Sequence, residues 1–292
     1  MPGSRPGRTV VITGGTDGIG RALADELLER GDTVVVVARN AGKGEAFRRR
    51  ARQLGAGERA FFVRADLGLL ADNERVLEAL AGFPVIDALV LCARHYRSDR
   101  AETAEGIEET FAHFYLSRYV LGHGLAPALL RADRPVVVNV AGPGADLGLV
   151  RWDDLEFRAD YQGGAALGQG GKLNDLLGVS SAERYGGAGL RYVLIHPGAT
   201  RTGISGQYDE PTLRYIRELQ RTAKPVSEAL GPVRDALDTP PPRPLSAFVE
   251  GRELPVDTKD FDAAAAHRLD AFTADFLARH RAAADGADGA RR

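Results

Sequence analysis

The fold of this chain is most constrained by a regular alternation of short apolar runs with longer segments of helical periodicity. Six runs rich in β-branched or aromatic residues are typical of buried strands: TVVIT (9–13), TVVVVA (33–38), AFFVRA (60–65), DALVLC (87–92), PVVVNV (135–140) and LRYVLIH (190–196). Four segments between them carry apolar residues at helical spacing: 19–30, 73–82, 106–130 and 172–186. This order predicts an α/β fold with a doubly wound parallel sheet of about seven strands and helices on both faces.

The rest of the chain fits the same single domain, which we expect to cover residues 1–292. No internal repeat and no long linker divides it. The segment 204–238 is helical but irregular, which is typical of an insertion that covers a substrate. The Pro-rich segment 239–245 predicts a turn into a last strand, SAFVEG. An Ala-rich helix is expected at about 260–285.

Composition narrows the class of protein. Acidic and basic residues are interspersed and the net charge is −2, so nothing indicates a nucleic-acid partner. Cys92 is the only cysteine, which excludes an internal disulfide and offers no cluster for a metal. No apolar stretch is long enough for a signal peptide or a membrane span, so we expect a cytoplasmic protein without a membrane partner. The strong preference for Arg over Lys, with much Ala and Gly, suggests a bacterial genome of high GC content.

A glycine-rich loop, TGGTDGIG (13–20), connects the first strand to the first helix. In this position the backbone can approach a pyrophosphate, and the N–H groups of the helix N-terminus can point at it. The spacing does not match a nucleotide-binding Walker loop. The loop therefore predicts a dinucleotide site, with these candidate contacts: Gly14, Thr16, Asp17, Gly18, Ile19 and Gly20.

The ends of the second and third strands predict which dinucleotide is bound. Arg39 stands where an NAD site would place an acidic residue for the ribose hydroxyls. A guanidinium there suits a 2′-phosphate, which favours NADP(H) over NAD(H), although a solvated arginine at a strand end would look the same. Asp66 and Leu67 follow the third strand. They are placed to hold the edge of an adenine ring, unless Asp66 caps the next helix.

These motifs resemble the short-chain dehydrogenase/reductase superfamily, over roughly residues 8–205. The segments RWDDL (151–155), KLNDLL (172–177) and IHPGATRT (195–202) are most similar to its retinol-dehydrogenase-like branch. The resemblance implies a Rossmann fold, a nicotinamide cofactor and a small-molecule substrate. It also implies further cofactor contacts, at Cys92, Ala93, Lys172, Pro197, Gly198 and Thr202.

The resemblance breaks at the catalytic positions of the family, which normally hold a tyrosine, a serine and an asparagine. Four residues before Lys172, the tyrosine position holds Gly168, or Leu167 if the alignment slips by one. No hydroxyl occurs at 141–143, and the asparagine position best matches Phe114. The family lysine lowers the pKa of the tyrosine and holds the ribose. We expect Lys172 to keep the ribose role, the alternative being a surface lysine at a helix start.

A replacement for the lost acid is offered by CARHYRSDR (92–100), which follows the fourth strand. Four large polar residues, Arg94, His95, Tyr96 and Arg97, are expected beside the nicotinamide. His95 titrates near neutrality and Tyr96 is a phenol, so either is a candidate acid. Arg94 is a candidate for binding an anionic substrate or an oxyanion. The alternative is an ordinary solvated loop.

Three functions fit this pattern. The first is an NADP(H)-dependent reductase with a non-standard proton donor, acting on a small organic substrate. The second is a non-redox cyclase, isomerase or dehydratase on the same fold, and the third is an inactive NADP(H)-binding sensor or partner protein. The aromatic-rich segment 106–130 would allow a homodimer or homotetramer interface, as in many members of the family.

Overall fold

The computed structural model describes residues 7–203 and 206–289, and within them it confirms the doubly wound α/β fold. The main sheet has the strand order β10-β9-β7-β6-β4-β1-β2-β3, and all neighbours are parallel except β10 and β9. Its strands are β1 (Thr9–Thr13), β2 (Thr33–Ala38), β3 (Ala60–Arg64), β4 (Ala88–Leu91), β6 (Val136–Val140), β7 (Arg191–His196), β9 (Leu245–Val249) and β10 (Arg252–Leu254). The sequence did not predict β10, a short and largely exposed edge strand.

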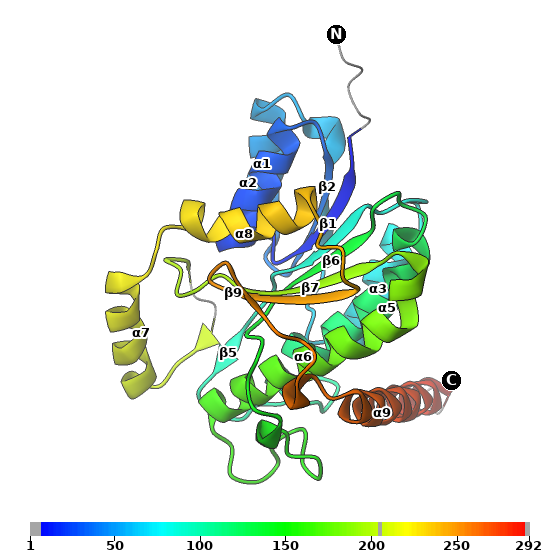
Figure 1. Ribbon diagram of the computed structural model, residues 1–292, viewed down its shortest axis with the longest axis vertical. Coiled ribbons are helices and arrows are strands. Elements are labelled where there is room, and N and C mark those ends of the chain that lie inside the picture. Colours follow the sequence, from blue (N-terminus) through cyan, green and yellow to red (C-terminus); the bar gives the residue numbers. More distant parts are fainter. Residues whose placement is uncertain (1–6, 204–205, 290–292) are drawn as a thin grey trace.

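Helices cover both faces of the sheet (Figure 1). One layer consists of α1 (Gly18–Glu29), α2 (Ala41–Gln53) and α8 (Val226–Asp238). The other consists of α3 (Leu70–Leu80), α5 (Ser117–Leu129) and α6 (Gly163–Tyr185), with α9 (Ala263–Gly289) packed on α6. Alternate strand residues serve the two layers, so Val10 and Ile12 belong to one apolar core and Val11 to the other. No helix in the described ranges is long and apolar enough to cross a membrane.

Several predicted boundaries change. Helix α2 was not predicted, because its sequence is rich in Arg and only Gly44, Phe47 and Ala51 are buried. The segment 106–130 is not one regular helix. It starts as the short α4 (Glu109–Phe111), widens into a π-helix at Ala112–Leu116 and continues as α5. Helix α6 begins at residue 163, so the glycine cluster before Lys172 lies inside the helix rather than ahead of it.

The segment predicted to cover a substrate divides into two different parts. Helix α8 packs against α1 and the sheet, so it belongs to the body of the fold. Helix α7 (Glu210–Thr222) has no buried residue and stands away from the sheet (Figure 1). Just before α7, β8 (Gly206–Gln207) pairs in parallel with β5 (Tyr96–Arg97). This small sheet ties the start of α7 to the loop that follows β4.

Candidate functional site

The glycine loop between β1 and α1 packs tightly against two other segments. Gly14 has φ +69°, and an added Cβ would lie 2.9 Å from the Cα of Ala93. Gly18 has φ +52°, and its Cβ would lie 2.9 Å from Cγ2 of Thr202. A Cβ at Gly20 would lie 2.7 Å from the carbonyl oxygen of Gly14. Glycine is therefore required at all three positions for this packing, and no side chain of these residues stands between the loop backbone and a ligand.

Both segments beside the loop carry predicted cofactor contacts. Ala93 donates its backbone N–H to Oγ1 of Thr13 at 3.3 Å, and burial raises the pKa of the Cys92 thiol to about 12. Cys92 therefore stays protonated, as expected of a residue that offers only its backbone. After β7, Pro197 and Gly198 are buried and make the turn that leads to Thr202. At the mouth of the loop, the Asp17 carboxylate caps α1 and pairs with Lys43.

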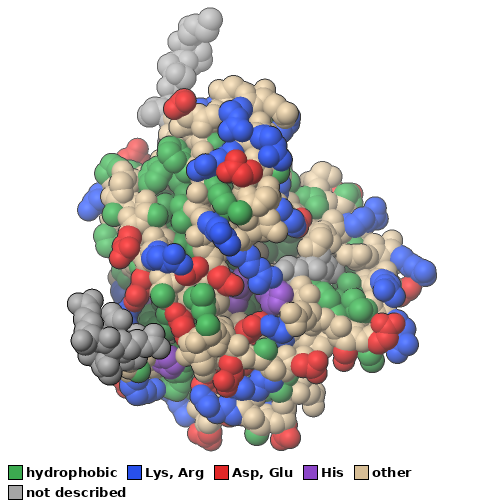
Figure 2. Space-filling view, turned by 180° about the vertical axis from the view of Figure 1, so that it is seen from behind, with side chains coloured by type: hydrophobic (Ala, Val, Ile, Leu, Met, Phe, Trp, Pro, Cys, Tyr) green, Lys and Arg blue, Asp and Glu red, His purple; other side chains and the backbone are tan. Residues whose placement is uncertain are grey.

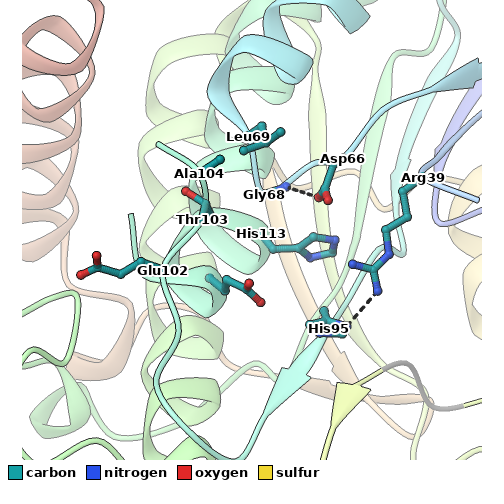
Figure 3. A pocket seen from close by; sticks show the side chains of 10 residues that line it. Arg39, Asp66, Gly68, Leu69, His95, Glu102, Thr103, Ala104 and His113 are labelled. Atoms are coloured by element: carbon teal, nitrogen blue, oxygen red, sulfur yellow. Dashed lines mark hydrogen bonds between the residues drawn. The ribbon is translucent and has the colours of Figure 1, made fainter. Parts of the chain in front are cut away.

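A pocket of about 200 Å³ lies beyond the carboxyl ends of β2 and β3 (Figure 3). It is lined by Arg39, Asp66, Gly68, Leu69, His95, Glu102, Thr103, Ala104, Glu109 and His113. On one side, Nη2 of Arg39 lies 3.4 Å from Nδ1 of His95. Histidine side chains also lie near the middle of one face of the molecule, with Lys and Arg side chains beside them (Figure 2). The predicted adenosine-binding residues Arg39 and Asp66 thus share one cavity.

The helix-cap alternative for Asp66 is wrong. Oδ1 of Asp66 accepts the N–H of Gly68 at 3.0 Å, and α3 begins only at residue 70. The N-terminus of α3 is capped instead by Glu105, whose carboxylate accepts the N–H groups of Leu70 and Ala71 at 2.6 and 3.0 Å. Leu67 is buried in the core, so only its backbone is available to a ligand.

The loop after β4 sends its side chains in two directions, because it is extended and alternate residues face opposite sides. His95 and Arg97 face the pocket side. His95 contacts Arg39, and Arg97 forms two hydrogen bonds of 2.5 Å with Glu109. His95 therefore lies in the pocket with Arg39 and Asp66, and Arg97 is held in an ion pair with Glu109. The four residues Arg94 to Arg97 do not form the single group that the sequence predicted.

Arg94 and Tyr96 face the other way and meet Tyr208, which the sequence did not single out. The rings of Tyr96 and Tyr208 stack with centroids 5.3 Å apart and 12° between their planes. Burial raises the pKa of Tyr208, and the charge of Arg94 opposes this shift. The same charge, after burial, lowers the pKa of His196, which ends β7. Arg94, Tyr96, Tyr208 and His196 thus form a group at the carboxyl ends of β4 and β7.

The pKa values of both pocket histidines are lowered. Burial is the main reason that the pKa of His113 falls to about 3, with the charges of His95 and Arg118 acting in the same direction. Burial and then the charge of Arg39 lower the pKa of His95. Nδ1 of His113 is buried and makes no hydrogen bond within the part of the chain that the structure describes.

Lys172 is fully buried, so the surface-lysine alternative is wrong. Its Nζ donates to Oδ2 of Asp175 and to the carbonyl of Asp260, both at 2.8 Å, and lies 5.1 Å from the centre of the Phe261 ring. Burial raises the pKa of Asp175 to about 6, against the opposing effect of Lys172. These two partners leave the ammonium one further N–H donor. Because Lys172 is fully buried, its predicted contact with a ribose requires the groups that cover it to move.

The glycines before Lys172 differ in what surrounds them. A Cβ at Gly170 would lie 2.7 Å from Cδ1 of Phe114, so this glycine makes room for a ring that packs on α6. A Cβ at Gly168 would meet only Cδ1 of Leu149, at 3.8 Å. The position one helical turn before Lys172 therefore has space for a larger residue.

A buried polar network lies beneath the ends of β4 and β6. The Arg118 guanidinium donates to Asn139, to the carbonyl of Val140 at 3.0 Å and to that of Ala93 at 2.9 Å. Burial lowers the pKa of Arg118 to about 10. Asn139 in turn donates to Tyr192 at 2.8 Å. The network fixes the ends of the two strands on which the site is built.

Comparison with known proteins finds relatives among the dehydrogenases. Residues 8–152 match the family model described as short chain dehydrogenase. Human retinol dehydrogenase 14 is 30% identical, covering 73% of this chain and 67% of that protein. Mouse retinol dehydrogenase 11 is 26% identical, and the match covers 68% of this chain. This chain therefore spans 64% of the length of that relative. A short chain dehydrogenase structure from Escherichia coli, complexed with NADPH, has a TM-score of 0.63 at 18% identity, covering 86% of this chain and 100% of that one.

Proposed function

We propose that this chain, which belongs to the short-chain dehydrogenase/reductase family of oxidoreductases, is an NADP(H)-dependent reductase of a small organic substrate. One observation carries this proposal. The glycine loop excludes side chains at three positions, and a pocket containing Arg39 and Asp66 opens beyond the adjacent strands. The residues present therefore fit the pyrophosphate and adenosine parts of a dinucleotide.

The preference for NADP(H) rests on Arg39. Its guanidinium lines the pocket at the end of β2, where a carboxylate would serve the ribose hydroxyls of NAD(H). Two parallel hydrogen bonds from a guanidinium match a phosphate well. Asp66 is placed in the same pocket to accept a hydrogen bond from the adenine amino group.

We propose that the proton donor belongs to the group formed by Arg94, Tyr96, Tyr208 and His196 at the carboxyl ends of β4 and β7. When bound, the dinucleotide supplies a hydride from its nicotinamide ring. Gly168 offers no acid, whereas Tyr96 presents a phenol stacked on Tyr208 near Arg94.

The cofactor proposal is tested by titrating the protein with NADPH and with NADH, following nicotinamide fluorescence. We expect tighter binding of NADPH, and an Arg39→Gln variant that loses about 10- to 100-fold of NADPH affinity while NADH affinity changes little. Arg48→Gln is the matched control, because Arg48 is an exposed arginine on α2 that does not line the pocket. Equal affinity for the two dinucleotides, in the wild type and in both variants, would contradict the assignment.

A second candidate is an inactive NADP(H)-binding protein, and the burial of Lys172 favours it. An ammonium that is fully buried would assist proton transfer at a bound substrate only after a rearrangement that exposes it. This candidate predicts the same NADPH titration with no oxidation of NADPH by any carbonyl compound.

A further inference from the structure

Arg94 is the starting point, because its guanidinium has no structural partner within the described residues. No ion pair and no hydrogen bond of its side chain is formed there, and the side chain keeps exposed surface. An unpaired guanidinium of this kind can form charge-assisted hydrogen bonds with a bound anion.

The neighbouring arginines differ from Arg94 in this respect. Arg97 is paired with Glu109, and Arg100 with Glu102 at 2.8 Å. Arg118 is satisfied by Asn139 and by two backbone carbonyls. These side chains hold the fold together, whereas Arg94 contributes no such contact.

The position of Arg94 places it next to the cofactor loop. It directly follows Ala93, whose backbone lies against Gly14. Its electrostatic neighbours, Tyr208 and His196, come from the segment before α7 and from the end of β7. Neither brings a negative charge at neutral pH, and the hydroxyl of Tyr208 is buried without a hydrogen-bond partner among the described residues. Arg94 and this hydroxyl are therefore available donors on one side of the loop.

We infer that Arg94 binds a carboxylate of the substrate, so that the reductase acts on small oxo acids rather than on neutral carbonyl compounds. This inference rests on the proposed function, because it names the substrate class of the same site. A planar guanidinium binds a carboxylate through two parallel hydrogen bonds, which fixes the orientation of the substrate as well as its position. The stacked rings of Tyr96 and Tyr208 would then contact its carbon chain.

The test measures the binding of four oxo acids and their methyl esters by saturation-transfer difference NMR, with and without NADP⁺. The acids are pyruvate, acetoacetate, levulinate and 5-oxohexanoate, which vary the distance between carbonyl and carboxylate. We expect at least one acid to bind and its ester to bind at least tenfold more weakly. Arg94→Gln should weaken binding of that acid about 10- to 100-fold, and Arg94→Lys should weaken it less.

Arg217→Gln is the matched control, since Arg217 is an exposed arginine on α7. It should bind the acid as the wild type does. Failure of all four acids, equal binding of acid and ester, or unchanged affinity in Arg94→Gln would each overturn the inference. So would a loss of NADPH affinity in Arg94→Gln without a loss of acid binding, because Arg94 would then serve the cofactor. Failure of the proposed function is seen separately, as absence of NADPH binding to the wild type.

Discussion

At the scale of single residues, the buried pair of Lys172 and Asp175 has a large expected effect on stability. Both side chains are fully buried, so each charge has given up its water and depends on the other. Oδ2 of Asp175 also accepts the N–H of Gly144 at 3.0 Å, while Oδ1 has no partner within the described chain. The pair therefore connects α6 to the loop after β6 and, through Asp260, to the segment before α9.

Removing one member of this pair should destabilise the protein strongly. We expect Lys172→Met to lower the free energy of unfolding by about 3–5 kcal/mol, because it leaves the Asp175 carboxylate buried without its cation. The double variant Lys172→Met/Asp175→Asn should recover at least half of that loss. Urea-induced unfolding measures both. If Lys172→Met were as stable as the wild type, the ammonium would not stabilise the protein through its buried ion pair with Asp175.

His113 should make the protein sensitive to acid. Its pKa is about 3 when folded and 6.5 when unfolded, so below pH 6.5 the unfolded chain binds a proton that the folded protein does not. This contribution to stability is present above pH 6.5 and is lost as the pH falls. At pH 5 the loss is up to about 2 kcal/mol.

Unfolding measured at pH 7 and pH 5 checks this prediction. The His113→Leu variant should lose less stability than the wild type between the two values. His267→Gln is the control, because His267 is an exposed histidine on α9 paired with Glu183. The prediction fails if His113→Leu and the wild type lose equal amounts.

At the scale of secondary-structure elements, two glycines of α6 lie close to Lys172 in different surroundings. Gly168 precedes Lys172 by one turn, on the same face of the helix, and an added Cβ there would meet only Cδ1 of Leu149, at 3.8 Å. Gly170 is different, because Phe114 occupies the space that a side chain would need. The two glycines lie within one turn but respond differently to substitution.

Gly168→Tyr should fold and should gain NADPH-dependent reduction of carbonyl compounds. We expect a gain of tenfold or more, below the upper range of general-acid catalysis because Lys172 is occupied by Asp175. Gly164→Tyr is the matched control. An added Cβ at Gly164 meets nothing within 4 Å, but Gly164 lies two helical turns from Lys172. Steady-state rates compare the variants. Equal rates in the two would contradict the idea that the tyrosine position is open for catalysis.

Substitution at Gly170 should instead affect stability. Gly170→Ala places a Cβ 2.7 Å from the Phe114 ring, and we expect a loss of about 1–3 kcal/mol despite the better helix propensity of alanine. Urea-induced unfolding measures this. A gain in stability would show that Phe114 moves away at little cost.

At the scale of the whole molecule, the sequence predicted the sheet well, because β-branched runs such as 33–38 have a strong and local signal. Helix α2 and strand β10 escaped prediction because they bury few residues. The burial of Lys172 was also out of reach, since its partners include a backbone carbonyl 88 residues away along the chain. Likewise, the meeting of Tyr96 with Tyr208 depends on the pairing of β5 with β8.

At the same scale, the loop after β4 separates two groups of polar residues. On one side, Arg39 and Asp66 share a pocket beyond the ends of β2 and β3. On the other side, Tyr96 stacks on Tyr208, and β5 pairs with β8. The proposed function assigns the first group to the cofactor and the second group to the substrate.

The proposed function requires hydride transfer at the side of the site formed by the loop after β4 and the segment before α7. The most direct measurement is the loss of NADPH absorbance when the wild-type protein is mixed with NADPH and a panel of small carbonyl compounds, oxo acids and enones included. We expect oxidation of NADPH that depends on the substrate and falls about 10²-fold or more in Tyr96→Phe. Tight NADPH binding without oxidation by any member of the panel would contradict it and would identify the protein as an inactive NADP(H)-binding relative of these enzymes.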